Sequence, residues 1–342
     1  MVNGMKNSQD KIDFVIIWVD GNDPEWQKEK NKYDSSADSD NRIIRYRDWG
    51  LLKYWFRGVE KYAPWVNKIH FVTWGHLPEW LDTNNPKLNI VNHKDFIPKE
   101  YLPTFSSHVI ELNLHRIKGL SDKFVYLNDD TFLISDSPKS YFFKDNKPMD
   151  SCALNVHCVK KSIIMQTICN NDVSIINEHF DFKKSMKENW KKWFSLKNGK
   201  ELLRTIALFG CPRFPGFYQP HLPNSYLKST FEEVWKQEPE ILHSTCLNKF
   251  RNVSDVNQWV FREWQLASGN FEVRKSKYGE TFYIDRDGLE IKKDILSCIK
   301  NQKRKAISIN DGDMSEEEFN NLTKDIQDAF ESILPDKCSY EK

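Results

Sequence analysis

Two adjacent carboxylates, Asp129 and Asp130, follow directly on an apolar run that ends at Asn128. The run, residues 123–128, contains β-branched and aromatic residues and is typical of a buried strand. In an open α/β sheet, ligands bind at the carboxyl ends of the strands, so chemistry is expected there. Hard oxygen ligands suit Mg²⁺ or Mn²⁺ on a diphosphate, because such a metal keeps waters and needs only one or two carboxylates. Asn and Asp are also common turn residues, so from this triplet alone a plain turn is an equally good interpretation.

A second apolar run, residues 13–19, ends in the same way, in Asp20, Gly21 and Asp23. It supplies two more carboxylates and a glycine at which the backbone could approach a ligand. Asp-Gly is also a hairpin signal. However, the following residues, 25–41, are polar and charged and offer no partner strand, which favours a binding loop.

A third short run, residues 306–309, leads into Asn310 and Asp311. Three apolar strands that each close on Asn or Asp are hard to explain by turn chemistry. We therefore expect one acidic cluster, built from distant parts of the chain.

The elements that must position these groups alternate in type. Residues 51–62 and 106–117 have helical spacing of apolar residues, whereas residues 68–73 and 88–91 are predicted strands. This alternation indicates βαβ units and an α/β fold with a mostly parallel, Rossmann-like sheet. We assign residues 12–150 to this half of the chain.

The second half, residues 151–342, is predicted to be mainly helical and to complete the same active site. Several amphipathic helices are expected within residues 172–268, and a small hairpin around Asp287-Gly288 within residues 271–295. Ser315 and Glu318 form the capping-box pattern of a final helix that runs to residue 334.

The composition excludes several classes of protein. The 50 Lys and Arg nearly balance the 49 Asp and Glu, so no basic field indicates a nucleic-acid partner. The seven cysteines are odd in number and include no Cys-x-x-Cys pair, which favours reduced thiols in a cytoplasm. No secretory signal is evident at the N-terminus, and no apolar run approaches the roughly 20 residues needed to span a bilayer. We expect a cytoplasmic protein with at most peripheral membrane contact, at the inner face of a bacterial plasma membrane.

These residues resemble the Stealth family, hexose-1-phosphoryltransferases of bacterial capsule synthesis and of the animal GlcNAc-1-phosphotransferase. The first matching segment is Ile-Trp-Val-Asp-Gly-Asn-Asp-Pro at residues 17–24, and the second begins with Arg-Tyr-Arg-Asp at residues 45–48. Leu112-Asn113 stands where members often carry Ser-His, and Tyr340 stands for a usual Phe. The remaining similar segments are residues 60–65, 102–107, 111–130, 220–223, 250–255, 309–311 and 335–341.

The resemblance implies a UDP-sugar donor whose sugar-1-phosphate passes to a hydroxyl of a capsular or cell-surface polysaccharide or a lipid-linked oligosaccharide, releasing UMP. A Mg²⁺ or Mn²⁺ ion on Asp129 and Asp130, with Asp311, would bridge the diphosphate. The resemblance also implies a glycosyltransferase-A-like sheet, with residues 12–150 as the nucleotide-sugar and metal-binding half. The expected donor-binding residues are Asp20, Gly21, Asp23, Arg45 and Asn128.

Two further residues are candidates for the chemistry itself. His221 is the candidate general base, because its pKa is the closest to neutral pH. Arg251 is a candidate clamp on phosphate oxygens, because a guanidinium pairs with them bidentately. Some candidates also have a structural interpretation. His221 lies between two prolines and could be a packed loop residue. Asp255 could be a helix N-cap, and Arg45 and Arg47 could form salt bridges that hold the first helix.

Two other functions remain open. A conventional metal-dependent glycosyltransferase, which releases UDP, would have almost the same metal site. A carbohydrate-binding module would use the abundant aromatics, 12 Trp, 12 Tyr and 22 Phe, but would leave the acidic triplets idle.

Overall fold

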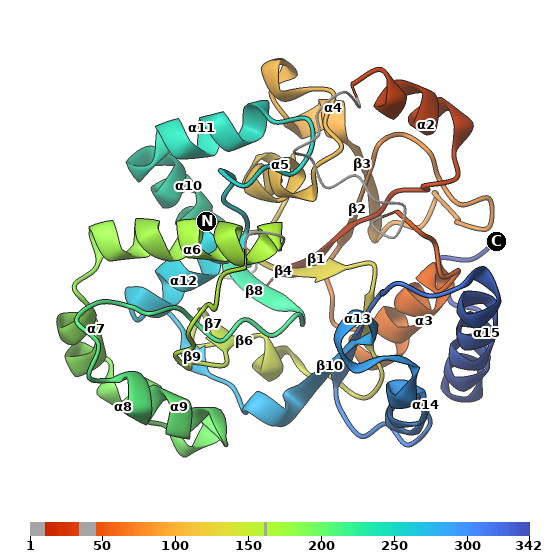
Figure 1. Ribbon diagram of the computed structural model, residues 1–342. Coiled ribbons are helices and arrows are strands. Elements are labelled where there is room, and N and C mark those ends of the chain that lie inside the picture. Colours follow the sequence, from red (N-terminus) through yellow and green to blue (C-terminus); the bar gives the residue numbers. More distant parts are fainter. Residues whose placement is uncertain (1–10, 34–45, 161–162) are drawn as a thin grey trace, which may run out of the picture.

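A five-stranded sheet forms the centre of the computed structural model, which describes residues 11–33, 46–160 and 163–342 (Figure 1). Its strand order is β3-β2-β1-β4-β8, and only β8 runs antiparallel to its neighbour. The predicted mostly parallel α/β sheet is confirmed. The strands are β1 (Ile12–Ile17), β2 (Ile69–Thr73), β3 (Leu88–Asn92), β4 (Lys123–Asn128) and β8 (Asn224–Leu227).

Two small sheets extend this centre. In one, β10 (Gly279–Tyr283) lies parallel to β11 (Ala306–Asn310), which pairs antiparallel with β5 (Thr131–Leu133). Because β5 follows β4 after a two-residue turn, the end of β11 is brought beside the end of β4. The backbone N–H of Ile309 donates to the carbonyl of Asp130 at 3.0 Å. The other sheet contains β6 (Phe143–Lys144), β7 (Lys147–Asp150) and β9 (Glu272–Val273).

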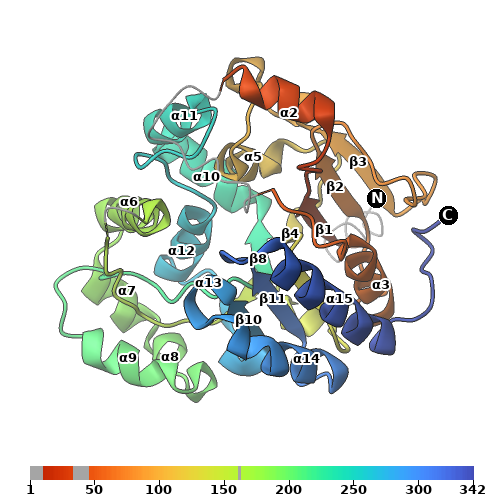
Figure 2. The same ribbon diagram turned by 45° about the vertical axis from the view of Figure 1, so that its right-hand side comes forward.

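The central strands are buried on both faces, as expected of parallel strands covered by helices. Along β1, Phe14 and Ile16 belong to one hydrophobic core and Val15 to the other. The first core is closed by α3 (Leu52–Tyr62), α14 (Lys292–Lys300) and α15 (Glu316–Ile333) (Figure 2). The second is closed by α5 (Ser107–Leu112), α6 (Ile164–His179), α10 (Lys228–Gln237), α11 (Pro239–Leu247) and α12 (Trp259–Ala267).

The remaining helices lie at the periphery. Short helices α2 (Pro24–Asn31) and α4 (His93–Phe96) follow β1 and β3, and α13 (Ile284–Asp287) follows β10. Helices α7 (Phe182–Glu188), α8 (Trp190–Trp193) and α9 (Glu201–Leu208) form one end of the molecule, far from α15 (Figures 1 and 2). Among the helices within the described ranges, none is long and apolar enough to cross a membrane.

Several sequence predictions can be compared directly with these elements. The predicted helix at 51–62 is α3, and the predicted capping box of the last helix is present at Ser315 and Glu318. The helix predicted at 106–117 is shorter, because α5 ends at Leu112 and a single 3₁₀ turn, Leu114–Arg116, follows it.

The predicted hairpin around Asp287-Gly288 is wrong. Asp287 ends α13, and Gly288, with φ of 68°, leaves the helix in a conformation that suits glycine. Strand β10 pairs in parallel with β11 across an intervening helix, so the Asp-Gly signal belongs to a helix end. The polar residues after β1 also begin as a helix, α2, instead of a loop.

Both parts of the chain contribute to the same sheets. Strand β8 from the second half joins the first-half strands, and β5 from the first half joins β11. The division at residue 150 stays a prediction.

Candidate active site

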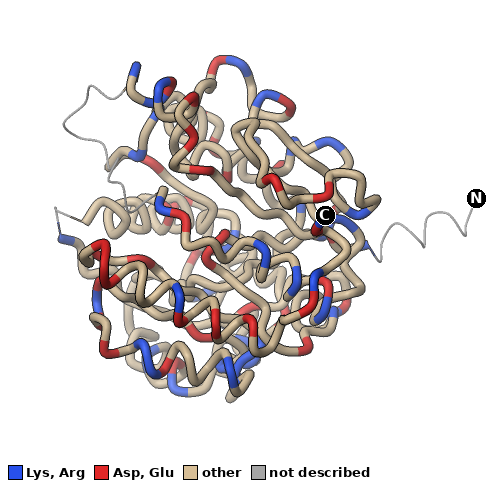
Figure 3. Tube along the Cα trace, turned by 90° about the vertical axis from the view of Figure 1, so that its right-hand side faces the viewer, with Lys and Arg blue, Asp and Glu red and all other residues tan. Residues whose placement is uncertain are grey.

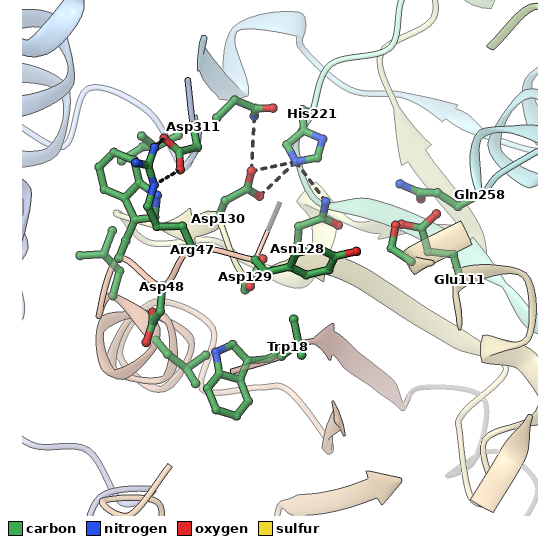
Figure 4. Close-up of a pocket in the computed structure, with 18 of the residues that line it drawn as sticks. Trp18, Arg47, Asp48, Glu111, Asn128, Asp129, Asp130, His221, Gln258 and Asp311 are labelled. Carbon is green, nitrogen blue, oxygen red and sulfur yellow. Dashed lines mark hydrogen bonds and ion pairs between the residues drawn. The ribbon is translucent and has the colours of Figure 1, made fainter. Parts of the chain in front are cut away.

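A cavity of about 300 Å³ opens at the carboxyl ends of β1 and β4 (Figure 4). Its walls also include the segment before α3, helix α5, the end of β11 and the start of α12. The charged and amide side chains that line it are Arg47, Asp48, Glu111, Asn128, Asp129, Asp130, His221, Arg251, Asn257, Gln258, Asn310 and Asp311.

Asp130 and His221 form a hydrogen-bonded pair in this cavity. The Nε2 of His221 lies 3.0 and 3.1 Å from the two carboxylate oxygens of Asp130, and the amide nitrogen of Asn128 lies 3.1 Å from Nε2 (Figure 4). Burial lowers the pKa of His221, but the charge and hydrogen bond of Asp130, with the charges of Glu111 and Asp129, together outweigh this effect, so the pKa is raised. The loop of His221 is fixed by Thr281 of β10, whose hydroxyl donates to the His221 carbonyl at 3.2 Å.

Asp129 faces the same cavity but has no such partner. Its carboxylate accepts no side-chain hydrogen bond from any residue within the described ranges, and it is exposed to the solvent of the cavity. Desolvation by the surrounding protein atoms raises the pKa of Asp129, and the charges of Asp130 and Asp48 raise it further, to about 7. Closely spaced anionic groups of this kind are stabilised by a bound cation.

Asp311 follows the end of β11, close to Asp130, and is in a bidentate ion pair (Figure 4). Arg47 donates to it from Nε at 2.8 Å and from Nη2 at 2.6 Å, and the guanidinium also stacks 4.2 Å from the centre of the Phe319 ring. The pair joins the segment before α3 to the end of β11. Arg47 was predicted as a possible salt bridge that holds the first helix, and its partner, Asp311, is 264 residues away.

Arg251 and Glu111 line the wall of the cavity that contains α5. Arg251 donates from Nη2 to the hydroxyl of Ser107 at 2.9 Å. Glu111 is buried and accepts from the Tyr126 hydroxyl at 3.1 Å. Glu111 was not predicted as a site residue, because at the sequence level it has the pattern of an ordinary helix position.

A second cavity of about 140 Å³ adjoins the first and shares Asn128, Asp129 and Arg251 with it. His93, at the start of α4, lines it with 7% of its surface exposed, and neither of its ring nitrogens has a hydrogen-bond partner. Burial lowers the pKa of His93 to about 4, so the imidazole is neutral at pH 7. Aromatic rings form much of the remaining wall, from Trp18, Trp26, Tyr46, Phe105 and Tyr126.

Asp20, Gly21 and Asp23 do not line either cavity. Asp23 is the N-cap of α2, accepting from the N–H groups of Glu25 and Trp26 at 2.8 and 3.1 Å. A Cβ at Gly21 would lie 2.1 Å from the carbonyl oxygen of Tyr46, so glycine permits contact with the protein's own backbone. The donor-binding role of these three residues stays a prediction.

His76 holds this loop in place. The N–H of Asp20 donates to Nε2 of His76 at 2.8 Å, so Nδ1 carries the proton and donates to Asp23 at 3.0 Å. The charge of Asp20 still reaches the cavity, where it contributes to raising the pKa of Asp48.

Two other residues were named from the sequence, Arg45 and Asp255. Arg45 lies outside the described residues. Asp255 is buried and accepts hydrogen bonds from the Asn252 N–H and the Asn248 side chain at 2.8 and 2.7 Å, whereas α12 begins at Trp259. Asp255 is therefore neither the N-cap of α12 nor a cavity residue.

The residues present fit a Mg²⁺ or Mn²⁺ ion bound jointly with a phosphate ligand. Within the described ranges, no three His, Cys, Asp or Glu side chains converge into a preformed metal cage. Mg²⁺ usually binds through one or two carboxylates, substrate phosphates and waters. The open carboxylate of Asp129 beside Asp130 meets that requirement, whereas both oxygens of Asp311 are already occupied by Arg47.

Comparison with known proteins gives consistent matches along the chain. Residues 45–150 match the model of Stealth protein CR2, conserved region 2, and residues 10–38 match Stealth protein CR1, conserved region 1. The chain is 45% identical over 341 residues to the capsular polysaccharide phosphotransferase WcwK of Streptococcus pneumoniae, covering 99% of this chain and 100% of that protein. It is 41% identical over 339 residues to the receptor polysaccharide phosphotransferase WefC of Streptococcus gordonii, covering 97% and 99%.

A solved structure, the galactosyltransferase LgtC in complex with donor and acceptor sugar analogs, aligns with a TM-score of 0.38 and 11% sequence identity. The alignment covers 91% of this chain and 95% of that chain.

Proposed function

The chain belongs to the Stealth family, and from this premise we propose that it transfers a hexose-1-phosphate or N-acetylhexosamine-1-phosphate from a UDP-sugar to a hydroxyl of a capsular or cell-surface polysaccharide. The coarser assignment, a bacterial polysaccharide phosphotransferase, follows from similarity that extends along the whole chain. The acceptor oxygen bonds to the phosphorus that carries the sugar. The bond from that phosphorus to the bridging oxygen breaks, and UMP leaves with the electron pair.

The observation that carries this proposal is the meeting of three kinds of group in one cavity. The open carboxylate of Asp129, the Asp130–His221 pair and the guanidinium of Arg251 all line it. Phosphoryl transfer depends mainly on positioning and on neutralising charge, with little covalent participation by the protein. A cation site, a base and a phosphate-binding cation are the parts that this chemistry requires.

Asp129 and Asp130 are the residues that would hold the divalent ion. When bound, that ion would neutralise charge on the diphosphate and on the departing UMP. Asp311 has a different role in this proposal from the one its sequence suggested. Its bidentate pairing holds the Arg47 guanidinium at the wall of the cavity, where Arg47 offsets the charge of Asp311 and leaves Asp129 and Asp130 to the metal.

His221 is positioned to receive the proton of the acceptor hydroxyl. With Nε2–H donating to Asp130, Nδ1 carries the lone pair and has no partner among the described residues. Asp130 stabilises the imidazolium that forms, because it raises the pKa of His221. We expect His221→Ala to lower kcat with little change in the KM for the donor, as for an interaction made mainly in the transition state. Near-normal turnover would remove His221 from the mechanism.

We propose that the second cavity receives the base of the nucleotide. Its aromatic walls provide stacking surfaces, and a neutral His93 offers one ring donor and one ring acceptor. The edge of uracil carries both an N–H donor and carbonyl acceptors, so the two are complementary. The shared residues Asn128 and Asp129 would then mark the passage from the base to the diphosphate.

The experiment that tests this function is identification of the nucleotide product. The protein is incubated with Mg²⁺, a panel of UDP-sugars and the polysaccharide acceptor, and the released nucleotide is identified by chromatography. We expect UMP together with a phosphodiester signal in the ³¹P spectrum of the glycan. Release of UDP with a new glycosidic bond would instead identify a conventional glycosyltransferase.

A further inference from the structure

Helix α9 exposes apolar side chains and buries polar ones. It buries the polar side chains of Glu201 and Thr205 and presents Leu203 and Ile206 to solvent, with 72% and 53% of their surfaces exposed. A helix on a globular protein normally turns its apolar stripe toward the core. The outward apolar stripe of α9 therefore requires a different explanation from core packing.

The neighbouring elements carry the same feature. Leu196, in the turn before α9, is 88% exposed, and Trp190 at the start of α8 is 56% exposed. Phe209, just after α9, is also exposed and lies against Phe194. Scattered exposed apolar residues are ordinary, but five large ones within 20 residues form a distinct surface. We call residues 182–210 with these side chains the α7–α9 face.

The charge of this segment is as unusual as its apolar content. Residues 182–210 contain eight Lys and Arg against two Glu, a net charge of +6, so the rest of the chain carries −5. Six of the lysines are exposed, and the buried Glu201 is paired with Arg204. On the side of the molecule that bears the C-terminus, by contrast, acidic and basic residues are interspersed (Figure 3). Together with the apolar side chains, the exposed lysines of residues 182–210 form one surface.

We propose that the α7–α9 face docks the protein on an anionic membrane surface. Interfacial helices combine Lys on the polar side with Trp, Phe and Leu that enter the boundary between headgroups and acyl chains. Each Lys near an anionic leaflet adds an attraction that falls off within a Debye length. A second copy of this chain is a poorer occupant, because it would bring two faces of +6 together. Docking through the α7–α9 face is independent of the reaction that the protein catalyses.

The test is co-sedimentation of the full chain with lipid vesicles. Vesicles of phosphatidylglycerol mixed with phosphatidylcholine are compared with vesicles of phosphatidylcholine alone, at low and at high salt. We expect binding to the anionic vesicles that weakens with salt. The double variant Leu203→Ser/Ile206→Ser should lower the partition coefficient by about tenfold or more, on the scale of removing two aliphatic side chains from an apolar environment.

Further variants test the contribution of charge, and separate measurements test whether each variant is folded. Lys191→Glu/Lys200→Glu should also weaken binding, whereas Lys324→Glu on α15 should not. Leu247→Ser, an exposed leucine on α11, is the matched control for the apolar change. Circular dichroism and thermal unfolding confirm that each variant is folded.

Two results would overturn the proposal. Equal partition of the wild-type protein and the Leu203→Ser/Ile206→Ser variant would show that the face does not insert. A dimer in sedimentation velocity that this variant abolishes, without vesicle binding by the wild type, would assign the face to self-association instead.

Discussion

Asp129 and Asp130 are neighbours in sequence but have different surroundings, and substitution should separate their roles. Asp129→Asn and Asp130→Asn should each lower turnover at least about a hundredfold, the scale of losing an essential electrostatic stabiliser. Asp130→Asn should also lower the pKa of His221, because the Asp130 charge is the main cause of its raised value. The acidic limb of the kcat–pH profile should therefore move to lower pH in Asp130→Asn, and less so in Asp129→Asn. Both the wild type and the variants are assayed with Mg²⁺ and with EDTA, and full wild-type activity in EDTA would contradict the metal role.

His93 is the residue whose unsatisfied hydrogen-bonding groups most directly indicate a ligand. We expect His93→Leu to raise the KM for the UDP-sugar about tenfold and to leave kcat nearly unchanged, the magnitude of one hydrogen bond to a bound ligand. His115 provides a matched control, because it is also buried, has an unpartnered Nδ1 and lines neither cavity. An equal rise in KM for His93→Leu and His115→Leu would show that the effect is structural and not due to recognition of the base.

At the scale of elements, helices α6 and α12 each carry a buried carboxyl group, Asp172 and Glu263, and the charge of Glu263 contributes to raising the pKa of Asp172. Each has one oxygen without a partner, and burial raises both pKa values, that of Glu263 to about 8. Because the folded pKa is raised above the usual value of 4.5, the protonated pair is fully stabilising below about pH 4.5. That stability is lost as the pH rises through about 8.

Glu263→Gln should remove this loss, since an amide stays neutral at every pH. We expect the free energy of unfolding at pH 9 to increase by about 2 kcal/mol relative to wild type, and the two proteins to converge near pH 4. Urea denaturation across this pH range measures the difference. The control is Glu232→Gln on α10, where the side chain is exposed and the profile should follow the wild type. A Glu263→Gln profile parallel to the wild type would show that Glu263 is already ionised in the fold.

The elements also show how far the sequence could predict the site. Runs that end in Asn or Asp correctly marked the ends of β4 and β11, because apolar patterning determines where parallel strands lie and their carboxyl ends share one edge. The run before Asp20 ends in the same way, but Asp20, Gly21 and Asp23 do not line the two cavities and Asp23 caps α2, so their donor-binding role stays a prediction. A helix cap and a ligand-binding carboxylate have the same local sequence, and only the packing of His76 against the loop distinguishes them.

At the scale of the whole molecule, the groups that sequence reasoning missed are those whose partners are distant. Arg47 and Asp311 are 264 residues apart, and no local pattern predicts that they pair. Glu111 and His93 lie in ordinary helical segments, and they became site candidates only when the fold placed them beside a cavity. The resemblance to a family could indicate which segments matter, but not which side chains in them face one another.

The division of the chain at residue 150 makes a prediction about the whole molecule. Phe132 packs on Phe330 with ring centres 4.9 Å apart, and Phe124 packs on Phe231 at 5.5 Å, so both cores are built across the division. Asp150 itself forms a fully buried bidentate pair with Arg262 at 2.7 and 2.8 Å. Removing one partner of such a pair costs about 3–5 kcal/mol, because it leaves an uncompensated buried charge.

We therefore expect residues 1–150, expressed alone, to show no cooperative thermal transition, and residues 151–342 to behave in the same way. Co-expression of the two fragments should restore a cooperative transition, because the cores and the Asp150–Arg262 pair can then form between chains. Calorimetry and circular dichroism of the separate and co-purified fragments provide the measurement. A cooperative transition of residues 1–150 alone, near the melting temperature of the full chain, would show instead that the first half is an independent domain. The active-site cavity would then lie between two domains and not within one.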